Sequence, residues 1–124
     1  MSLYKVNEGT TFVYKATIVD ENGAAIILTD ITTLTLTLYD LDAGSIINTR
    51  NAQNVLNLNG VTVHATSGLL TWTATPTDNA IVTASTPTGN YETHVALFQW
   101  TWNSGAKAGK HEMQVAVKQL LKTP

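Results

Sequence analysis

Apolar and polar side chains alternate along much of this chain, and the alternation predicts strands. Between Thr32 and Asp40, the residues Leu34, Leu36 and Leu38 fall on one face and threonines fall on the other. A half-buried antiparallel strand has this period of two, whereas a helix repeats its apolar positions every 3.6 residues. The segment Thr10–Val19 alternates in the same way. Both segments are therefore predicted to be strands with one buried face.

The longest apolar and β-branched run, Gly89–Trp102, predicts a long strand that crosses the middle of a β-sandwich. It holds two of the three tryptophans, and the turn Asn103–Gly105 closes it. Phe98, Trp100 and Trp102 share one face because one residue separates each from the next. The opposite face is also rather apolar, so this strand needs cover on both sides.

The rest of the chain predicts shorter strands separated by turn residues. Further strands are expected at Ala25–Leu28, Ile46–Asn48, Val61–Ala65, Leu69–Thr75 and Lys110–Gln119. Clusters of Gly, Asn, Asp and Ser predict turns at Asp20–Gly23, Asp42–Gly44, Asn59–Gly60 and Thr66–Gly68. Less regular segments are a loop or ragged edge at Asn51–Asn59, one short helical turn at Pro76–Val82 capped by Thr75 or Thr77, and a loop at Thr83–Thr88. Seven to nine strands with turn signals at a spacing of about 8–12 residues predict an all-β sandwich.

The composition is that of one small domain covering residues 1–124, with a core at about 3–119 and a short C-terminal tail. A chain of 124 residues buries roughly two-thirds of its unfolded surface, which is enough for a stable core without disulfides or bound metal ions. Charged residues make up 13% of the chain, about half the usual share, and threonine supplies much of the polar surface. Such a surface predicts contact with neighbouring proteins, although an ordinary threonine-rich domain has the same composition.

Net charge and cysteine content exclude several classes of protein. The net charge of −2 argues against a strongly basic nucleic-acid binder. The chain has no cysteine, which excludes disulfides, thiolate metal sites and cysteine nucleophiles. It has no run of about 18 apolar residues that would span a membrane, and Met1–Lys5 lacks the apolar core of a signal peptide. The protein is therefore expected in a cytoplasm unless it leaves as part of a particle.

The few charges are unevenly distributed along the chain. Lys107, Lys110, Lys118 and Lys122 face a single acid, Glu112, in the last stretch, while the remainder of the chain is acidic. This polarity would align identical subunits head to tail. A solvated edge strand, on which lysines prevent pairing with other strands, accounts for this charge distribution equally well.

No motif for catalysis or metal binding is present in the sequence. His64, His94 and His111 are isolated from one another and match no metal-ligand spacing. His111-Glu112 and Glu92-x-His94 would hold a metal only if strands brought them together. Most aspartates and the serines lie in predicted turns, where backbone hydrogen bonding explains them. We therefore predict no enzyme, no cofactor and no metal site. The histidines are expected on the surface or in loops, with a hydrogen-bonded position at a subunit contact as the alternative for His94.

The face formed by Phe98, Trp100 and Trp102 has three interpretations. Aromatic side chains on one side of a strand would form a platform for a sugar or a nucleic-acid base. They would equally form a protein–protein contact, where tryptophans are over-represented. Core packing is the third interpretation, and it is the simplest one for Trp72. We expect part of the Phe98–Trp102 face to be an assembly interface.

Several turn and strand signatures resemble those of small phage Ig-like domains. The opening hairpin matches the pattern D-x-x-G-x-x-x-x-L-T at Asp20, Gly23, Leu28 and Thr29. The alternating leucine strand before Asp40 follows it, as in that family. The remaining signatures are Gly68-Leu69-Leu70-Thr71-Trp72, Thr77-Asp78 and Gly89-Asn90-Tyr91, so that the similarity covers about Leu3–Gln119. Asp78-x-Ala80 and Gly89-x-Tyr91 are also similar to the tyrosine corner of Ig domains, with a longer loop between them.

The pattern is similar to that of the N-terminal domain of phage baseplate upper proteins and of related tail, neck and capsid-decoration modules. The resemblance implies an Ig-like antiparallel β-sandwich in a non-enzymatic bacteriophage virion structural protein. A baseplate upper protein would carry a further C-terminal domain, so a decoration, neck or tail accessory role is expected as much as a baseplate role. The implied partners are other virion proteins, in a homo-oligomer or in many copies within a symmetric particle, with no nucleic acid and no membrane. The alternative is a carbohydrate-binding or adhesion module with Trp100 and Trp102 as its aromatic platform.

Overall fold

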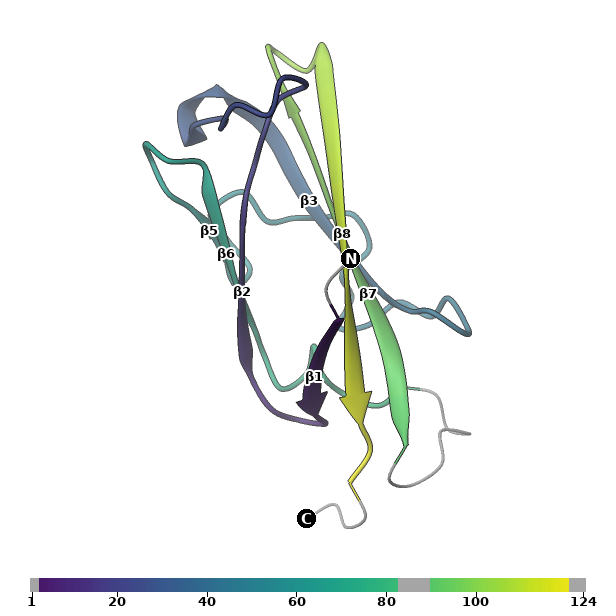
Figure 1. Cartoon of the computed structure of the whole chain (residues 1–124). Coiled ribbons are helices and arrows are strands. Elements are labelled where there is room, and N and C mark those ends of the chain that lie inside the picture. The colour runs from purple at the N-terminus through teal and green to yellow at the C-terminus, as the bar shows by residue number, and fades with distance from the viewer. Residues whose placement is uncertain (1–2, 83–89, 121–124) are drawn as a thin grey trace.

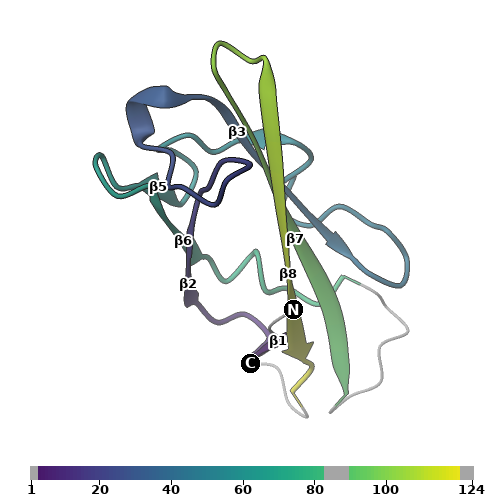
Figure 2. The same ribbon diagram turned by 45° about the horizontal axis from the view of Figure 1, so that its top comes forward.

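The structure, a computed structural model, describes residues 3–82 and 90–120. Two sheets face each other across the core (Figure 1, Figure 2). The larger sheet has five strands, in the order β1 (Leu3–Asn7), β8 (Lys107–Lys118), β7 (Tyr91–Trp102), β3 (Ile31–Asp40) and β4 (Gln53–Asn54). The smaller sheet has three, in the order β2 (Phe12–Thr17), β6 (Leu69–Ala74) and β5 (Val61–Val63). The predicted all-β sandwich is confirmed, with β7 at the centre of the larger sheet.

The strand order is that of an immunoglobulin sandwich. When the strands are lettered A, B, C, C′, D, E, F and G along the chain, the small sheet is B-E-D and the large sheet contains G-F-C-C′, as in variable-type Ig domains. The first strand lies on the large sheet, where it runs parallel to β8 with Leu3 opposite Gln114. The other strand pairs are antiparallel.

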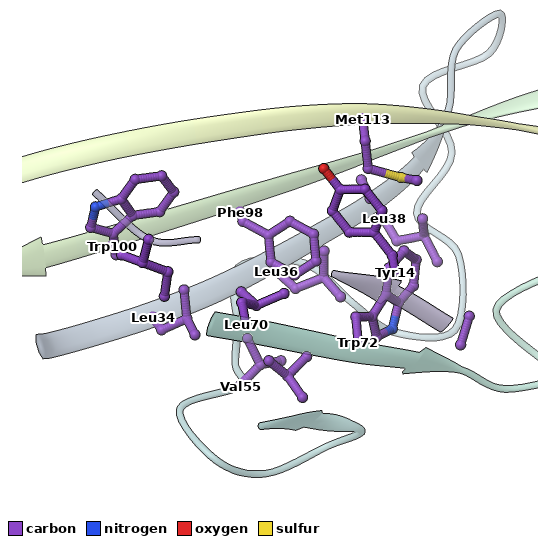
Figure 3. Packing of buried hydrophobic residues seen from close by; sticks show 14 of the residues in the cluster. Tyr14, Leu34, Leu36, Leu38, Val55, Leu70, Trp72, Phe98, Trp100 and Met113 are labelled. Carbon is purple, nitrogen blue, oxygen red and sulfur yellow. The ribbon is translucent and has the colours of Figure 1, made fainter. Parts of the chain in front are cut away.

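Every second residue of the long strands points into the core, as the alternation predicts. Leu34, Leu36 and Leu38 on β3 are each 0–1% exposed. Between the sheets, the rings of Trp72 on β6 and Phe98 on β7 meet edge to face, with centroids 5.8 Å apart (Figure 3). Full burial of a large apolar side chain contributes about 1.5–3 kcal/mol, so these layers supply most of the stability of the fold.

Strand β1 is missing from the predictions because its sequence signal is weak. Tyr4 and Val6 of this five-residue strand pack against the core, and two apolar positions are too few to show a period. Its backbone partners are on β8, more than 100 residues later in the chain. A short strand that depends on such a distant partner cannot be recognised from local alternation.

Two predicted strands are wrong in detail. Ala25–Leu28 forms only one bridge, from Ala25 to Val19, and then enters a 3₁₀-helix, η1 (Leu28–Asp30). Ile46–Asn48 also forms only one bridge, from Ile46 to Tyr39, because the chain turns at Asn48 with φ of 53°. In both places the apolar residues are present, but the chain leaves its neighbour after one bridge, at η1 in the first case and at Asn48 in the second.

The Pro76–Val82 segment, where at most one short helical turn is predicted, forms consecutive hydrogen-bonded turns. The N–H of Asp78 donates to the Thr75 carbonyl at 3.0 Å, and the N–H of Asn79 donates to the Pro76 carbonyl at 3.2 Å. The Thr75 hydroxyl accepts a further bond from the Asp78 N–H at 3.3 Å, as expected for a cap. The predicted loop at Thr83–Thr88 lies outside the described residues.

Candidate binding surface around Trp102

The predicted interface residues Phe98 and Trp100 lie in the interior of the sandwich. Phe98 is 1% exposed and Trp100 is 5% exposed. The indole N–H of Trp100 donates to the carbonyl of Val19 at 3.3 Å, and its ring lies against the backbone of Gly109. A Cβ built on Gly109 would approach the Trp100 ring to 2.6 Å, so a larger residue there would displace the ring. These contacts account for both rings by core packing.

Trp102 is the member of the set that remains partly exposed at the end of β7. It lines two hollows of about 630 and 340 Å³. Asp20 and Lys107 line both hollows. Because these volumes lie near or within the range of small-molecule sites, this end of the sandwich has room for a ligand or for a side chain of a partner.

Charged groups of both signs surround Trp102. Glu21 and Lys107 pair at 3.0 Å, with both side chains about half exposed. Such a pair contributes little to stability because water screens it, so either group is free to re-pair with a partner. Asp30 lines the larger hollow and Lys110 lines the smaller one. The arrangement is therefore suited to hydrogen bonding and stacking.

The outer face of the larger sheet carries an uncharged strip that crosses β3 and β7. We call it the threonine strip, and it consists of Thr33, Thr35, Thr37, Leu97, Gln99 and Thr101. Its members face one another in the register Thr33 to Thr101, Thr35 to Gln99 and Thr37 to Leu97, and each is partly or fully exposed. A hydroxyl–hydroxyl bond of 2.6 Å joins Thr33 to Thr101.

A buried ion pair links the loop after β3 to the loop after β6. The Arg50 guanidinium donates to Asp78 Oδ1 at 2.6 Å and to Oδ2 at 3.1 Å, and it also donates to the carbonyl of Asn59 at 3.0 Å. Burial acts to raise the pKa of Asp78. Hydrogen bonds from Arg50, Asn48 and the Thr75 N–H, together with the charge of Arg50, outweigh burial and hold this pKa below its ordinary value.

This ion pair was not predicted from the sequence. The sequence gives only a weak sign of it. Arg50 is the single arginine among seven basic residues, and it lies in a region rich in asparagine. Its partner, Asp78, lies in a predicted turn, where backbone hydrogen bonding is sufficient to explain an aspartate. Such a pair holds loops of different sheets together and is structural in role.

His94 and Glu92 form a second buried polar pair on the inner face of β7. His94 Nε2 lies 2.6 Å from Glu92 Oε2, and the side chains are 1% and 2% exposed. The N–H of Val82 also donates to Glu92 Oε2 at 3.0 Å. The expectation of a surface or loop position is wrong for His94, because the pleat of β7 directs both side chains inward.

The other two histidines are exposed and lie apart. His64 Nδ1 accepts bonds of 3.2 Å from the N–H groups of Thr66 and Ser67, which shape the turn before β6. On β8, His111 contacts the Tyr14 hydroxyl through Nε2. Burial raises the pKa of the Tyr14 hydroxyl above its ordinary value, and the neighbouring Tyr4 adds to the rise. Within residues 3–82 and 90–120, no three His, Asp or Glu side chains are grouped so as to hold a metal ion.

The resemblance to a tyrosine corner is not carried through in the structure. Tyr91 begins β7, but its side chain is 48% exposed, and the Lys5 ammonium lies over its ring at 5.9 Å from the centroid. The Asp78 carboxylate is paired with the Arg50 guanidinium instead. Gly89 lies outside the described residues.

Comparisons with protein-family models, with curated proteins and with solved structures found no match to this chain. In the part of the chain that the structure describes, no helix is long and apolar enough to cross a membrane.

Proposed function

We propose that this chain is a non-enzymatic bacteriophage virion structural protein, which acts as a decoration, neck or tail or baseplate accessory. Its Ig-like domain would bind other virion proteins and occur in many copies in a symmetric particle. The particle class comes from the sequence resemblance. The observation that supports an assembly role is the threonine strip, an uncharged surface on the outer face of the larger sheet in a chain with 13% charged residues.

The strip suits burial against another protein because its desolvation is inexpensive. Removing threonine and glutamine side chains from water costs far less than removing charges, and Thr35, Thr37 and Leu97 add apolar methyl groups. Interfaces are depleted in charged residues at their centres, as this strip is. The buried polar pairs Arg50–Asp78 and Glu92–His94 are engaged within the fold, so they support a structural role and not a chemical one.

Fractionation of phage particles tests the proposal. The protein should sediment with gradient-purified particles and stay with them through washing in moderate salt. Its absence from the particles would contradict a virion role. Thr35→Lys, which places a charge in the threonine strip, should reduce incorporation, whereas Thr62→Lys on the exposed face of β5 should not.

A carbohydrate-binding module is a second candidate, and the position of Trp102 favours it. Trp102 is partly exposed and borders two hollows that contain carboxylates and lysines, which is a usual setting for stacking on a sugar ring. Trp102→Ala should abolish glycan-array binding, while Tyr91→Ala, which removes an exposed aromatic ring outside the hollows, should leave it unchanged. A flat array for the unmodified protein would exclude this candidate.

A further inference from the structure

The upper half of β8 has a backbone edge that no described strand covers. β8 extends from Lys107 to Lys118, but β1 pairs only with Gln114–Lys118 (Figure 1). On the other side, β7 pairs with β8 along its whole length. Open edges are templates for pairing with another strand. The segment from Lys107 to Met113 is therefore a candidate contact for another chain.

The backbone groups that face this edge follow from the alternation of the strand. The N–H of Glu8 donates to the carbonyl of Lys118 at 2.9 Å, on the β1 side of β8. Since the N–H and C=O of one strand residue point the same way and successive residues alternate, the even-numbered residues direct their backbone groups to the β1 side. Above β1, these residues are Ala108, Lys110 and Glu112.

We propose that a second copy of this chain pairs antiparallel with this edge, with the two-fold axis at His111. In this register, Lys110 of each protomer lies opposite Glu112 of its partner, and the two residues exchange both backbone hydrogen bonds. The side chains of Lys110 and Glu112 lie on the same face of the sheet, where they form a cross-strand ion pair on each side of the axis. The two five-stranded sheets then join into one continuous sheet.

Charge selects this register over its neighbours. An axis at Lys110 would place lysine against lysine, and an axis at Gly109 would place Lys107 against His111 with no acid opposite Lys110. Like charges directly opposite destabilise a strand pair, whereas opposite charges stabilise it. An isologous contact requires a self-complementary segment, and Lys110-His111-Glu112 has this property about its central residue.

The lower end of the ladder is set by β1. Leu3 occupies the edge position beside Gln114, so the pairing between protomers extends from Gly109 to Met113. Side chains leave room for it, because Lys110, His111 and Glu112 are exposed. Lysines that guard a solvated edge are the competing account of the same residues. That account predicts a monomer, so the two are separable by experiment.

This contact specifies the homo-oligomer of the proposed function, but its test does not depend on a virion role. Sedimentation equilibrium of the purified chain over a concentration series should give a dimer. Glu112→Lys and Lys110→Glu should each raise the dimer dissociation constant by roughly tenfold or more, because both ion pairs become repulsive. The double variant K110E/E112K should restore the dimer dissociation constant of the unmodified protein. A monomer at all concentrations, or a double variant no better than the singles, would overturn the proposal.

A single introduced cysteine tests the register. The chain has no cysteine, and His111 would face its own copy in a non-hydrogen-bonded pair, where Cα atoms lie about 4.5 Å apart. This distance is within disulfide range. Mild oxidation of His111→Cys should give a crosslinked dimer, and Lys107→Cys, which lies beyond the ladder, should not. Crosslinking of Lys107→Cys but not of His111→Cys would overturn this register. Circular dichroism of each variant checks that the fold is retained.

Discussion

Arg50 Nε lies 2.6 Å from Asp78 Oδ1, with the two side chains 4% and 0% exposed. Arg50 lies between β3 and β4, and Asp78 follows β6, so the pair ties a loop of the larger sheet to a loop of the smaller one. A charge that loses its partner in such a place cannot be compensated by water. The pair is therefore the point at which a single polar substitution should affect the fold most.

Asp78→Asn should lower the free energy of unfolding by about 3–5 kcal/mol, because it leaves the Arg50 guanidinium buried without a counter-charge. Urea unfolding followed by tryptophan fluorescence would measure the loss. The exposed Asp30→Asn is a matched control and should change stability by less than about 0.5 kcal/mol. Equal unfolding midpoints for Asp78→Asn and the unmodified protein would show that the ion pair contributes nothing.

The same carboxylate should make stability depend on pH in the acid range. The pKa of Asp78 lies below its ordinary value of 3.8 in the folded protein, so the unfolded state binds the proton more readily. The stabilisation by Asp78 is present above about pH 4 and is lost as the pH falls through the folded pKa. The stability difference between the unmodified protein and Asp78→Asn should therefore shrink steadily below pH 4. A difference that grew on acidification would contradict the sign of this shift.

Gly109→Ala should destabilise the protein through Trp100. The added Cβ would lie 2.6 Å from the indole ring, and overpacking of this kind costs about 1–3 kcal/mol. Thermal unfolding gives the cost, and a shifted tryptophan emission maximum would report the displaced ring. Ala108→Ser, on the neighbouring exposed position of β8, adds one atom without this contact and should be nearly neutral. Equal melting temperatures for the two variants would show that the Trp100 ring moves aside at no measurable cost in stability.

Tyr14 should titrate at higher pH than an exposed tyrosine. Burial and the nearby Tyr4 raise its pKa above the ordinary value of 10.0, so its neutral hydroxyl stabilises the fold below pH 10. This stabilisation is lost as the pH rises through the folded pKa. In Tyr14→Phe, the phenolate absorbance should lose its latest-titrating component, and stability should fall less above pH 10. Loss of an early component instead would place Tyr14 in a water-like environment.

Alternation alone was sufficient for the long strands. The leucines of β3 and the apolar side chains of β6 point to the core as predicted, since the period of two is a local property of an extended chain. The turn at Asp20–Gly23 was also local, because the Asp20 carboxylate accepts bonds from the N–H groups of Asn22 and Ala24 at 2.9 and 3.0 Å. These features need no partner from elsewhere in the sequence.

Individual side chains could be assigned to the core or the surface only once the segments that pack against them were known. The sequence placed Phe98, Trp100 and Trp102 on one face, but only the stacked second sheet decides that Phe98 and Trp100 are interior and Trp102 is partly exposed. Likewise, no local pattern connects Arg50 with Asp78, which are 28 positions apart.

The sequence by itself therefore determined that the chain forms β-strands, where the long ones lie and which side chains share a face. The tertiary structure decided which strand lies beside which, that β1 covers only the lower half of β8, and which polar groups are buried as pairs. The reason is that pleat and turn chemistry act between neighbours in the chain, whereas burial, ion pairing and edge exposure arise between segments that meet only after folding.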